Sequence, residues 1–284
     1  MKDFLQLTPI QQNILVASIM GDGEITKIYR NSRRKNHSYR EHFGIQQEEY
    51  RKWKISFFNE FLYITPKSQC VRSRSMPLFT SLYPHFYRED GTKQIPLSLL
   101  SYCTLPHFLA VLYMDDGSLC ISSRVNKRKK RIYLTPHIYL YLQCYSHNEL
   151  PQLQRHILKH FHIAFQLSQR KDGKGMILKT TCVKDTFLFL DIIFNVTNTC
   201  PSMHYKTNWN ERLKLESMKW KHKYPNFDIV VSSSERYKPY SSEEIKLIKQ
   251  MKQNGMSIKE IASALQRSYW SIVYKWREIQ RYDI

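Results

Sequence analysis

The chain has 284 residues, 42% of them hydrophobic, which is enough apolar material for about two or three compact units and excludes a fully disordered chain. Lys and Arg outnumber Asp and Glu by 44 to 24, and the formal charge of +20 predicts a polyanionic partner. No apolar run reaches the roughly 18 residues of a membrane span and no signal peptide opens the chain, so we expect a soluble intracellular protein without a membrane partner.

The first hundred residues predict an alternation of helices and strands. Thr8 is a good N-cap and Pro9 suits the first helical position, so we expect a helix from there to Met20. After this helix, alternating and apolar segments predict the remaining elements of this part. These are strands at 24–30 and 40–47, a helix at 49–62, and strands at 70–75 and 78–83.

The second hundred residues repeat this order. The expected elements are a helix at 107–115, strands at 118–124 and 132–145, a helix at 150–161, strands at 165–169 and 176–181, and a helix at 183–194. Helices interleaved with pairs of strands are typical of an α+β fold. The sequence therefore predicts two halves, 1–104 and 105–222, each of αββαββα order with an antiparallel sheet.

A third unit is expected at 240–284, after a polar linker at 223–239. Two capping boxes, which begin at Ser241 and Ser257, predict the first two of three helices at 242–253, 258–265 and 269–280. Three short helices with a tight turn before the last are typical of a helix-turn-helix DNA-binding module. Its expected DNA contacts are Tyr269, Trp270, Lys275 and Arg277. The alternative is a small protein-interaction bundle.

Two segments share one unusual design, an apolar helical run that stops at an aspartate followed by glycine. They are 15–23 (LVASIMGDG) and 109–117 (LAVLYMDDG). A helix that is apolar on most sides is buried, and glycine suits the turn that ends it. If the two helices pack side by side, they hold Asp22 and Asp116 together at one end. Paired carboxylates in a basic protein favour Mg²⁺ held against a phosphodiester. The alternative for either aspartate alone is simple helix termination.

The two segments resemble the paired motifs of the LAGLIDADG homing endonucleases, in the monomeric branch that carries both motifs on one chain. Two further stretches extend the resemblance, GTKQIP at 91–96 and SMHYK at 202–206. Together they cover roughly the first 220 residues. The resemblance implies that the two halves form a pseudo-symmetric saddle that binds double-stranded DNA.

The resemblance also implies roles for single residues. Asp22 and Asp116 are expected to bind Mg²⁺, for which Mn²⁺ substitutes, with help from the backbone carbonyls of Gly21 and Asp115. The side chain of Asp115 is either a second carboxylate near the metals or a capping group. The lysines of the two further stretches are expected to stabilise charge or to position water near the metals. They are Lys93 and Lys206.

Basic stretches connect the first two strands of each half. A two-stranded ribbon can enter the major groove of DNA, where phosphate contacts give affinity and base contacts give specificity. The alternative for each stretch is a solvated charged loop. The expected DNA contacts are Arg30, Arg33, Arg34, Lys35, Arg40 and Gln46 in the first half, and Arg124, Lys127, Arg128, Lys129, Lys130, Arg131 and Gln143 in the second.

Neither the cysteines nor the histidines form a zinc pattern. The six cysteines include no Cys-x-x-Cys pair, so we expect reduced thiols. His156 and His160 lie one helical turn apart, but Ile157 stands where the zincin motif needs a glutamate.

These observations predict a monomeric, site-specific double-strand DNA endonuclease with no obligate protein partner. We expect it in a bacterial or phage-host cytoplasm or an organelle matrix. An intron-encoded or free-standing protein is favoured over an intein, because no splicing-type cysteine opens the chain. Two alternatives remain, an intron maturase that binds intron RNA and a transcription regulator. Intact Asp22 and Asp116 argue against a regulator and against a maturase that has lost cleavage, while a protein with both maturase and nuclease activity stays open.

Overall fold

The computed structural model describes residues 1–170, 172–232, 240–267 and 269–282, with the backbone alone for residues 270, 281 and 282. The chain falls into two compact units, Met1–Ser234 and Glu235–Ile284. Among the described residues, none of the helices combines the length and the apolar character needed to cross a bilayer.

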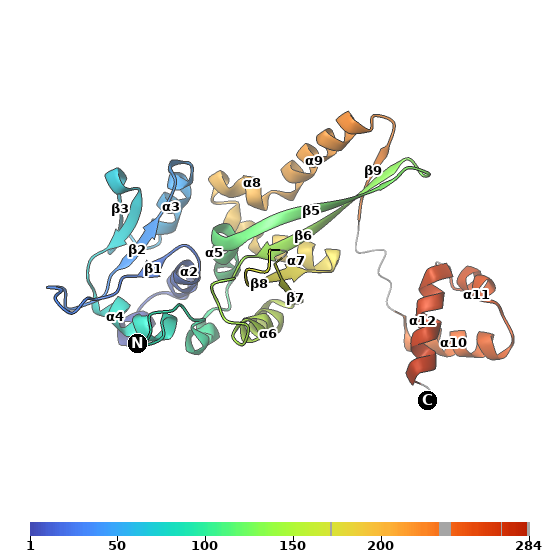
Figure 1. Ribbon diagram of the computed structural model, residues 1–284, viewed down its shortest axis with the longest axis horizontal. Coiled ribbons are helices and arrows are strands. Elements are labelled where there is room, and N and C mark those ends of the chain that lie inside the picture. Colours follow the sequence, from blue (N-terminus) through green and yellow to red (C-terminus); the bar gives the residue numbers. More distant parts are fainter. Residues whose placement is uncertain (171, 233–239, 268, 283–284) are drawn as a thin grey trace. The chain divides into compact units, whose positions relative to one another are not determined.

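The first half of the larger unit has an antiparallel sheet with strand order β1-β2-β4-β3 (Figure 1). Its first long helix, α2 (Pro9–Met20), begins as predicted, because the Thr8 and Gln11 side chains cap each other's backbone N–H groups. The other elements are α1 (Lys2–Leu5), β1 (Glu24–Ile25), β2 (Tyr39–His42), α3 (Glu48–Ile55), β3 (Leu62–Thr65), β4 (Cys70–Ser73) and α4 (Pro77–Phe86), with short 3₁₀ turns at Ile45–Gln47, Pro66–Ser68 and Leu97–Tyr102.

The predicted strand at 78–83 is wrong, because this segment lies in α4. Pro77 takes the first helical position, and four buried apolar side chains recur at helical spacing. They are Leu78, Phe79, Leu82 and Phe86. The fourth strand of the sheet is instead β3, which was not predicted; it begins at Leu62, the last residue of the helix predicted at 49–62, and pairs with β4. That helix, α3, ends at Ile55.

The predicted strands at 24–30 and 40–47 are much shorter than expected. Only Glu24 and Ile25 of β1 pair with β2. The segment between these strands is held by Arg34, whose guanidinium donates to the hydroxyls of Thr26 and Ser38 at 3.1 and 3.0 Å. Beyond the backbone hydrogen bond from the Thr26 N–H to the Ser38 carbonyl, side-chain hydrogen bonds therefore hold this segment, and the first-half ribbon is irregular.

The second half follows the predicted order closely. Its sheet contains β5-β6-β8-β7 in that order, all antiparallel, and the β5–β6 hairpin pairs over ten residues on each strand. The elements are α5 (Pro106–Asp116), β5 (Gly117–Asn126), β6 (Arg131–Leu140), α6 (Leu150–Phe161), β7 (Phe165–Gln169), β8 (Met176–Thr180) and α7 (Val183–Thr197).

The chain then adds elements that the sequence analysis did not predict. They are a short turn at Pro201–Met203, α8 (His204–Thr207), α9 (Trp209–Lys223) and β9 (Asp228–Val231). Four residues of the expected linker at 223–239 thus form β9, which pairs in parallel with residues 131–134 of β6. Since β8 pairs with β6 only at Tyr139 and Leu140, the outer part of β6 has a free edge that the β-branched residues of β9 fill.

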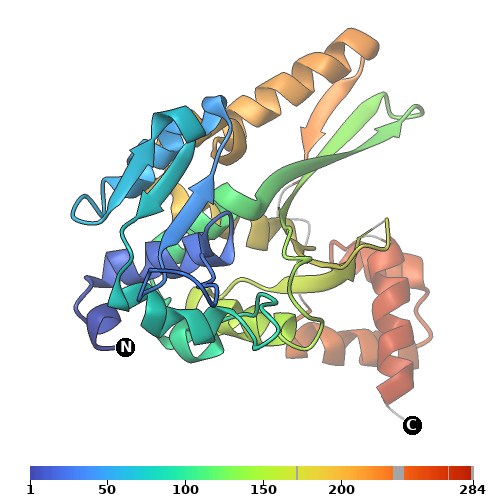
Figure 2. The ribbon, with the colours of Figure 1, turned by 60° about the vertical axis from the view of Figure 1, so that its left-hand side comes forward.

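The motif helices α2 and α5 lie side by side at the centre of the larger unit, between the two sheets (Figures 1 and 2). Both helices are almost wholly buried, as their apolar sequences predict. Polar contacts also join the halves, since the Asn13 side chain donates to the Tyr102 carbonyl and accepts from the Leu105 N–H. The Tyr145 hydroxyl donates to the Met20 carbonyl at 2.6 Å.

The smaller unit contains α10 (Ser242–Gln253), α11 (Ile258–Ala264) and α12 (Tyr269–Tyr282), and both predicted capping boxes are formed. Its core is a compact apolar cluster separate from that of the larger unit. The buried members of this core are Ile248, Ile261, Ala262, Ile272 and Ile279.

Candidate active site

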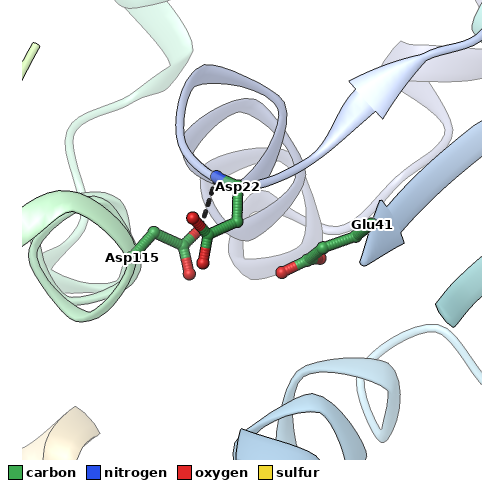
Figure 3. A group of neighbouring side chains, drawn as sticks. All are labelled: Asp22, Glu41 and Asp115. Carbon is green, nitrogen blue, oxygen red and sulfur yellow. Dashed lines mark hydrogen bonds between the residues drawn. The ribbon is translucent and has the colours of Figure 1, made fainter. Parts of the chain in front are cut away.

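The two Asp-Gly motifs meet at one end of the α2–α5 pair. Asp22 directly follows α2 and its C-cap Gly21, while Asp115 and Asp116 are the last two residues of α5. The helices approach so closely that a Cβ atom on Gly21 would lie 2.7 Å from the Asp115 Cβ. The Asp22 backbone N–H donates to Asp115 Oδ2 over a long 3.4 Å (Figure 3).

The two lysines predicted to be catalytic occupy matching positions. Lys93 Nζ donates to the Gly21 carbonyl at 2.9 Å. In the other half, Lys206 Nζ donates to the Met114 carbonyl at 2.8 Å and to the Asp115 carbonyl at 3.3 Å. Burial lowers the pKa of both lysines. Each lysine therefore sits beside the motif of its own half, on the backbone carbonyl expected to help bind metal.

Negative charge accumulates at Asp116. Burial and the neighbouring carboxylates of Asp115 and Asp22 raise its pKa to about 7, although Lys93 and Lys206 counteract this. A divalent cation relieves this kind of repulsion, and carboxylate and carbonyl oxygens are the ligands that Mg²⁺ prefers. The carboxylates of Asp22 and Asp116 and the carbonyls of Gly21 and Asp115 are thus oxygen ligands of the kind that suits magnesium.

A buried ion-pair network lies beside Asp22, and the sequence analysis did not anticipate it. Lys54 Nζ contacts Glu41 Oε1 at 2.8 Å and Asp115 Oδ1 at 3.0 Å. Arg51 Nε contacts Glu41 Oε1 at 2.8 Å, and the Tyr50 hydroxyl donates to Asp115 Oδ1 at 2.7 Å. The cations come from α3, Glu41 comes from β2, and Asp115 comes from the opposite half.

Arg51 also contacts Asp22, one of the two candidate catalytic aspartates. Its Nη2 contacts Asp22 Oδ2 at 2.6 Å, and the Asp22 side chain remains 31% exposed. Burial lowers the pKa of Arg51, but the carboxylates of Glu41 and Asp115 more than offset this, so its pKa is raised and it stays charged.

The carboxylates of Asp22, Glu41 and Asp115 lie within 4.8 Å of one another and point toward a common centre (Figure 3). Glu41 and Asp115 are fully buried and paired with Arg51 and Lys54, so their carboxylates are less available to a metal ion than the partly exposed carboxylate of Asp22. Two cations against three acids leave little unbalanced charge for a metal to neutralise. The Asp115 side chain is thereby tied into an ion-pair network, while its backbone carbonyl faces Lys206.

The predicted DNA contacts lie on the surface of the larger unit. Arg40 is half-buried and paired with Glu24, and the other predicted side chains are exposed. The exposed set is Arg30, Arg33, Arg34, Lys35, Gln46, Arg124, Lys127, Arg128, Lys129, Lys130, Arg131 and Gln143.

The sheet of the first half also carries two arginines that were not predicted from the sequence, Arg72 and Arg74. Arg40 and Arg72 are paired neighbours on β2 and β4, and both point away from the core. Together with Arg74 and Arg34 they line a cavity of about 650 Å³ over the sheet. The alternation of burial along a strand would find Arg72, but only once the strand register is known.

In the smaller unit, Tyr269 and Arg277 are exposed on α12. Lys275 Nζ contacts Glu278 at 2.8 Å and is mostly covered, so it is less available for a partner than predicted. The Trp270 side chain lies outside the described residues.

The model of the LAGLIDADG DNA endonuclease family matches residues 12–184. This is more than half of the chain, and the chain belongs to that family.

Two relatives are both named Protein RecA. The chain is 30% identical to that of Mycobacterium shimoidei over 122 residues, which are 42% of this chain and 28% of the relative. It is 24% identical to that of Mycolicibacterium flavescens over 206 residues, 71% of this chain and 47% of the relative. The chain thus spans less than half the length of these relatives.

Among solved structures, the homing endonuclease I-WcaI bound to its DNA recognition sequence matches with a TM-score of 0.54 and 21% identity. The match covers 72% of this chain and 91% of that one. At this identity the likeness is one of fold.

Proposed function

We propose that this protein is a site-specific homing endonuclease that hydrolyses both strands of a long DNA target with Mg²⁺. The supporting observation is the matched geometry of the two motif ends. Asp22 and Asp116 lie at the ends of adjacent helices, and each motif has a half-buried lysine on its backbone carbonyls. This duplicated arrangement in a member of a DNA endonuclease family suits cleavage at two phosphodiesters, one on each strand.

In this proposal the chain's own groups hold and orient the reactants. Asp22 and Asp116, with the carbonyls of Gly21 and Asp115, would bind Mg²⁺, and Mn²⁺ would substitute. When bound, the cation would supply polarisation of the phosphodiester and activation of water. Lys93 and Lys206 direct positive charge toward the place where the phosphate gains negative charge during cleavage. Partial burial of both lysines reduces their contact with water and strengthens their electrostatic effect.

We propose that the outward faces of the two sheets bind the DNA. The exposed cations of the β5–β6 hairpin, such as Arg124 and Arg128, and the arginines over the first sheet would contact phosphates, while polar side chains such as Gln143 would contact bases. The smaller unit would add contacts through α12, with Arg277 the most available cation among its predicted contacts. Alanine at Arg277 is expected to weaken DNA binding slightly and to leave the cleavage position unchanged.

The test is cleavage of a highly diverse random DNA library with purified protein and Mg²⁺, followed by sequencing of the new ends. EDTA and Asp116→Asn serve as controls. A recurrent long motif with uniform short 3′ overhangs, absent from both controls, is expected. If no ends are enriched although the protein binds DNA in a salt-dependent way, the nuclease assignment is wrong, and binding to intron RNA becomes the next measurement.

A further inference from the structure

Asp115 differs in character from its counterpart in the first motif. The two motifs align at Asp22 and Asp116, so Asp115 corresponds to Gly21, which carries no side chain. The Asp115 carboxylate extends away from its own half and into the first half, where Tyr50, Lys54 and the Asp22 backbone N–H all donate to it. A second-motif residue is thus held by first-half groups.

The corresponding region of the second half is apolar. Leu140 lies opposite Gly117 in the β5–β6 ladder, and the same alignment places Glu41 opposite Gly23 in the first half. Likewise Ile138 corresponds to Tyr39, whose hydroxyl donates to Glu41. At these two strand positions the second half therefore has apolar side chains, while the first half has a carboxylate and the tyrosine that donates to it.

Buried charges are costly to fold. Taking ions out of water carries a desolvation penalty, and well-packed apolar side chains are often as stable as a buried ion pair or more so. The side chains of Glu41 and Asp115 are fully buried, and those of Arg51 and Lys54 are 1% and 2% exposed. Because the second half builds the same fold with Leu140 and Ile138, the fold alone does not require these charges.

The network acts on Asp22 from two sides. Asp115 accepts the Asp22 backbone N–H, and Asp115 Oδ1 lies 3.7 Å from Arg51 Nη1. Arg51 Nη2 in turn contacts the Asp22 carboxylate at 2.6 Å. Asp115 thus contacts the backbone of Asp22 directly and its carboxylate through Arg51. Among the described residues, no hydrogen bond or ion pair joins the Asp115 carboxylate to Asp116.

We propose that the Asp115 side chain is a positioning residue that couples the two halves by fixing Asp22, through Lys54 and Arg51, in the orientation needed for cleavage. This inference rests on the proposed nuclease function. It assigns the carboxylate of Asp115 to orienting Asp22 and not to binding metal. This role also explains why the first half retains buried charges that the stability of the fold does not require.

The test uses single-turnover cleavage of the target DNA by the full chain, with DNA affinity and thermal unfolding measured in parallel. Asp115→Asn keeps the shape and removes the charge. We expect cleavage to fall at least about tenfold, as when groups that orient a metal ligand are removed, with DNA affinity unchanged. The matched control is Asp191→Asn on α7, where the aspartate is exposed, and it is expected to cleave like the wild type.

A double variant separates positioning from stability. In Asp115→Asn, Lys54 loses a partner, and the added change Lys54→Met removes the cation left behind. We expect the double variant to regain thermal stability but not cleavage. If cleavage returns to the wild-type rate in the double variant, the positioning role is wrong.

The two levels of the proposal fail in different ways. A wild-type protein that binds but never cleaves overturns the nuclease function, and with it this inference. A wild type that cleaves alongside an Asp115→Asn protein that cleaves equally well overturns only the role of Asp115.

Discussion

The two halves of the larger unit share a topology but differ in how each builds its part of the site. In the second half, a regular hairpin of ten residues per strand is supported by β9, and the interior behind the motif is apolar. In the first half, the paired ribbon is short and the interior holds a charged network. The pseudo-symmetry of the two halves is therefore strict for the positions of the aspartates and lysines, and relaxed for the side chains that pack behind them.

The largest effect is expected from the two aspartates. Asp22→Asn and Asp116→Asn each remove a charge that Mg²⁺ binding is proposed to need, so each should lower double-strand cleavage at least about 100-fold. Binding to the target should stay close to the wild-type level. Cleavage of a supercoiled plasmid that carries the target distinguishes single-strand nicking from double-strand cleavage, since nicked and linear products separate on a gel. Full double-strand cleavage by either variant would contradict the proposal that both aspartates are needed for the reaction.

The lysines are expected to come next. Lys93→Met and Lys206→Met keep side-chain length and remove a cation near the reacting phosphate, so each should lower the cleavage rate about 100-fold or less. Rates on end-labelled strands measure each cut separately. Similar losses for both variants would extend the symmetry of the site to function. An unaffected rate in one variant would confine that role to a single half.

A moderate effect on stability is expected at the contact between the motif helices. Gly21→Ala places a methyl group 2.7 Å from both Asp115 Cβ and Oδ2, and the ion pair with Lys54 hinders the carboxylate from moving away. Overpacking of this kind costs about 1–3 kcal/mol in the free energy of unfolding. Urea denaturation measures it. Gly44→Ala is the control, since nothing lies within 4 Å of the Cβ it would add.

The smallest effect is expected at the ribbons. Replacing Arg124, Arg128 and Arg131 with Gln should weaken DNA binding and reduce the slope of log affinity against log salt by about 0.9 for each phosphate that the variant no longer neutralises. The same change at Arg30, Arg33 and Lys35 is the matched comparison. We expect the larger reduction from the hairpin variant, because its strands are longer and more regular. Equal reductions would mean that the irregular ribbon of the first half binds DNA as extensively.

Much of the second half could be predicted from its sequence. Long alternating strands such as β6 and the amphipathic pattern of α6 give strong local signals. The helix α6 lies where expected, and β6 begins where expected but ends at Leu140, five residues before the predicted end. The first half was harder, because β1 and β2 are too short for periodicity to define them. The segment 78–83 shows the same difficulty, since a short apolar run fits a strand or a helix until its partners are known.

The active site divides in the same way. The Asp-Gly motifs predicted Asp22 and Asp116 as site residues, and two flanking stretches predicted Lys93 and Lys206. The sequence did not reveal the network around Arg51, because charges on a helix ordinarily indicate a solvent-facing side. Their acidic partners come from β2 and from the other motif, so only tertiary structure shows that these charges are compensated.

The contact of Gly21 with Asp115 has a consequence for how this molecule is assembled. A homodimer with a true two-fold axis would place identical residues at this point. Two aspartates would bring like charges and two side chains into the same space, while two glycines would leave Tyr50 and Lys54 without their shared acceptor. Only a chain that encodes both halves separately can set an aspartate against a glycine. The covalent fusion of the halves thus permits an asymmetric contact between the motif helices that a symmetric homodimer cannot form.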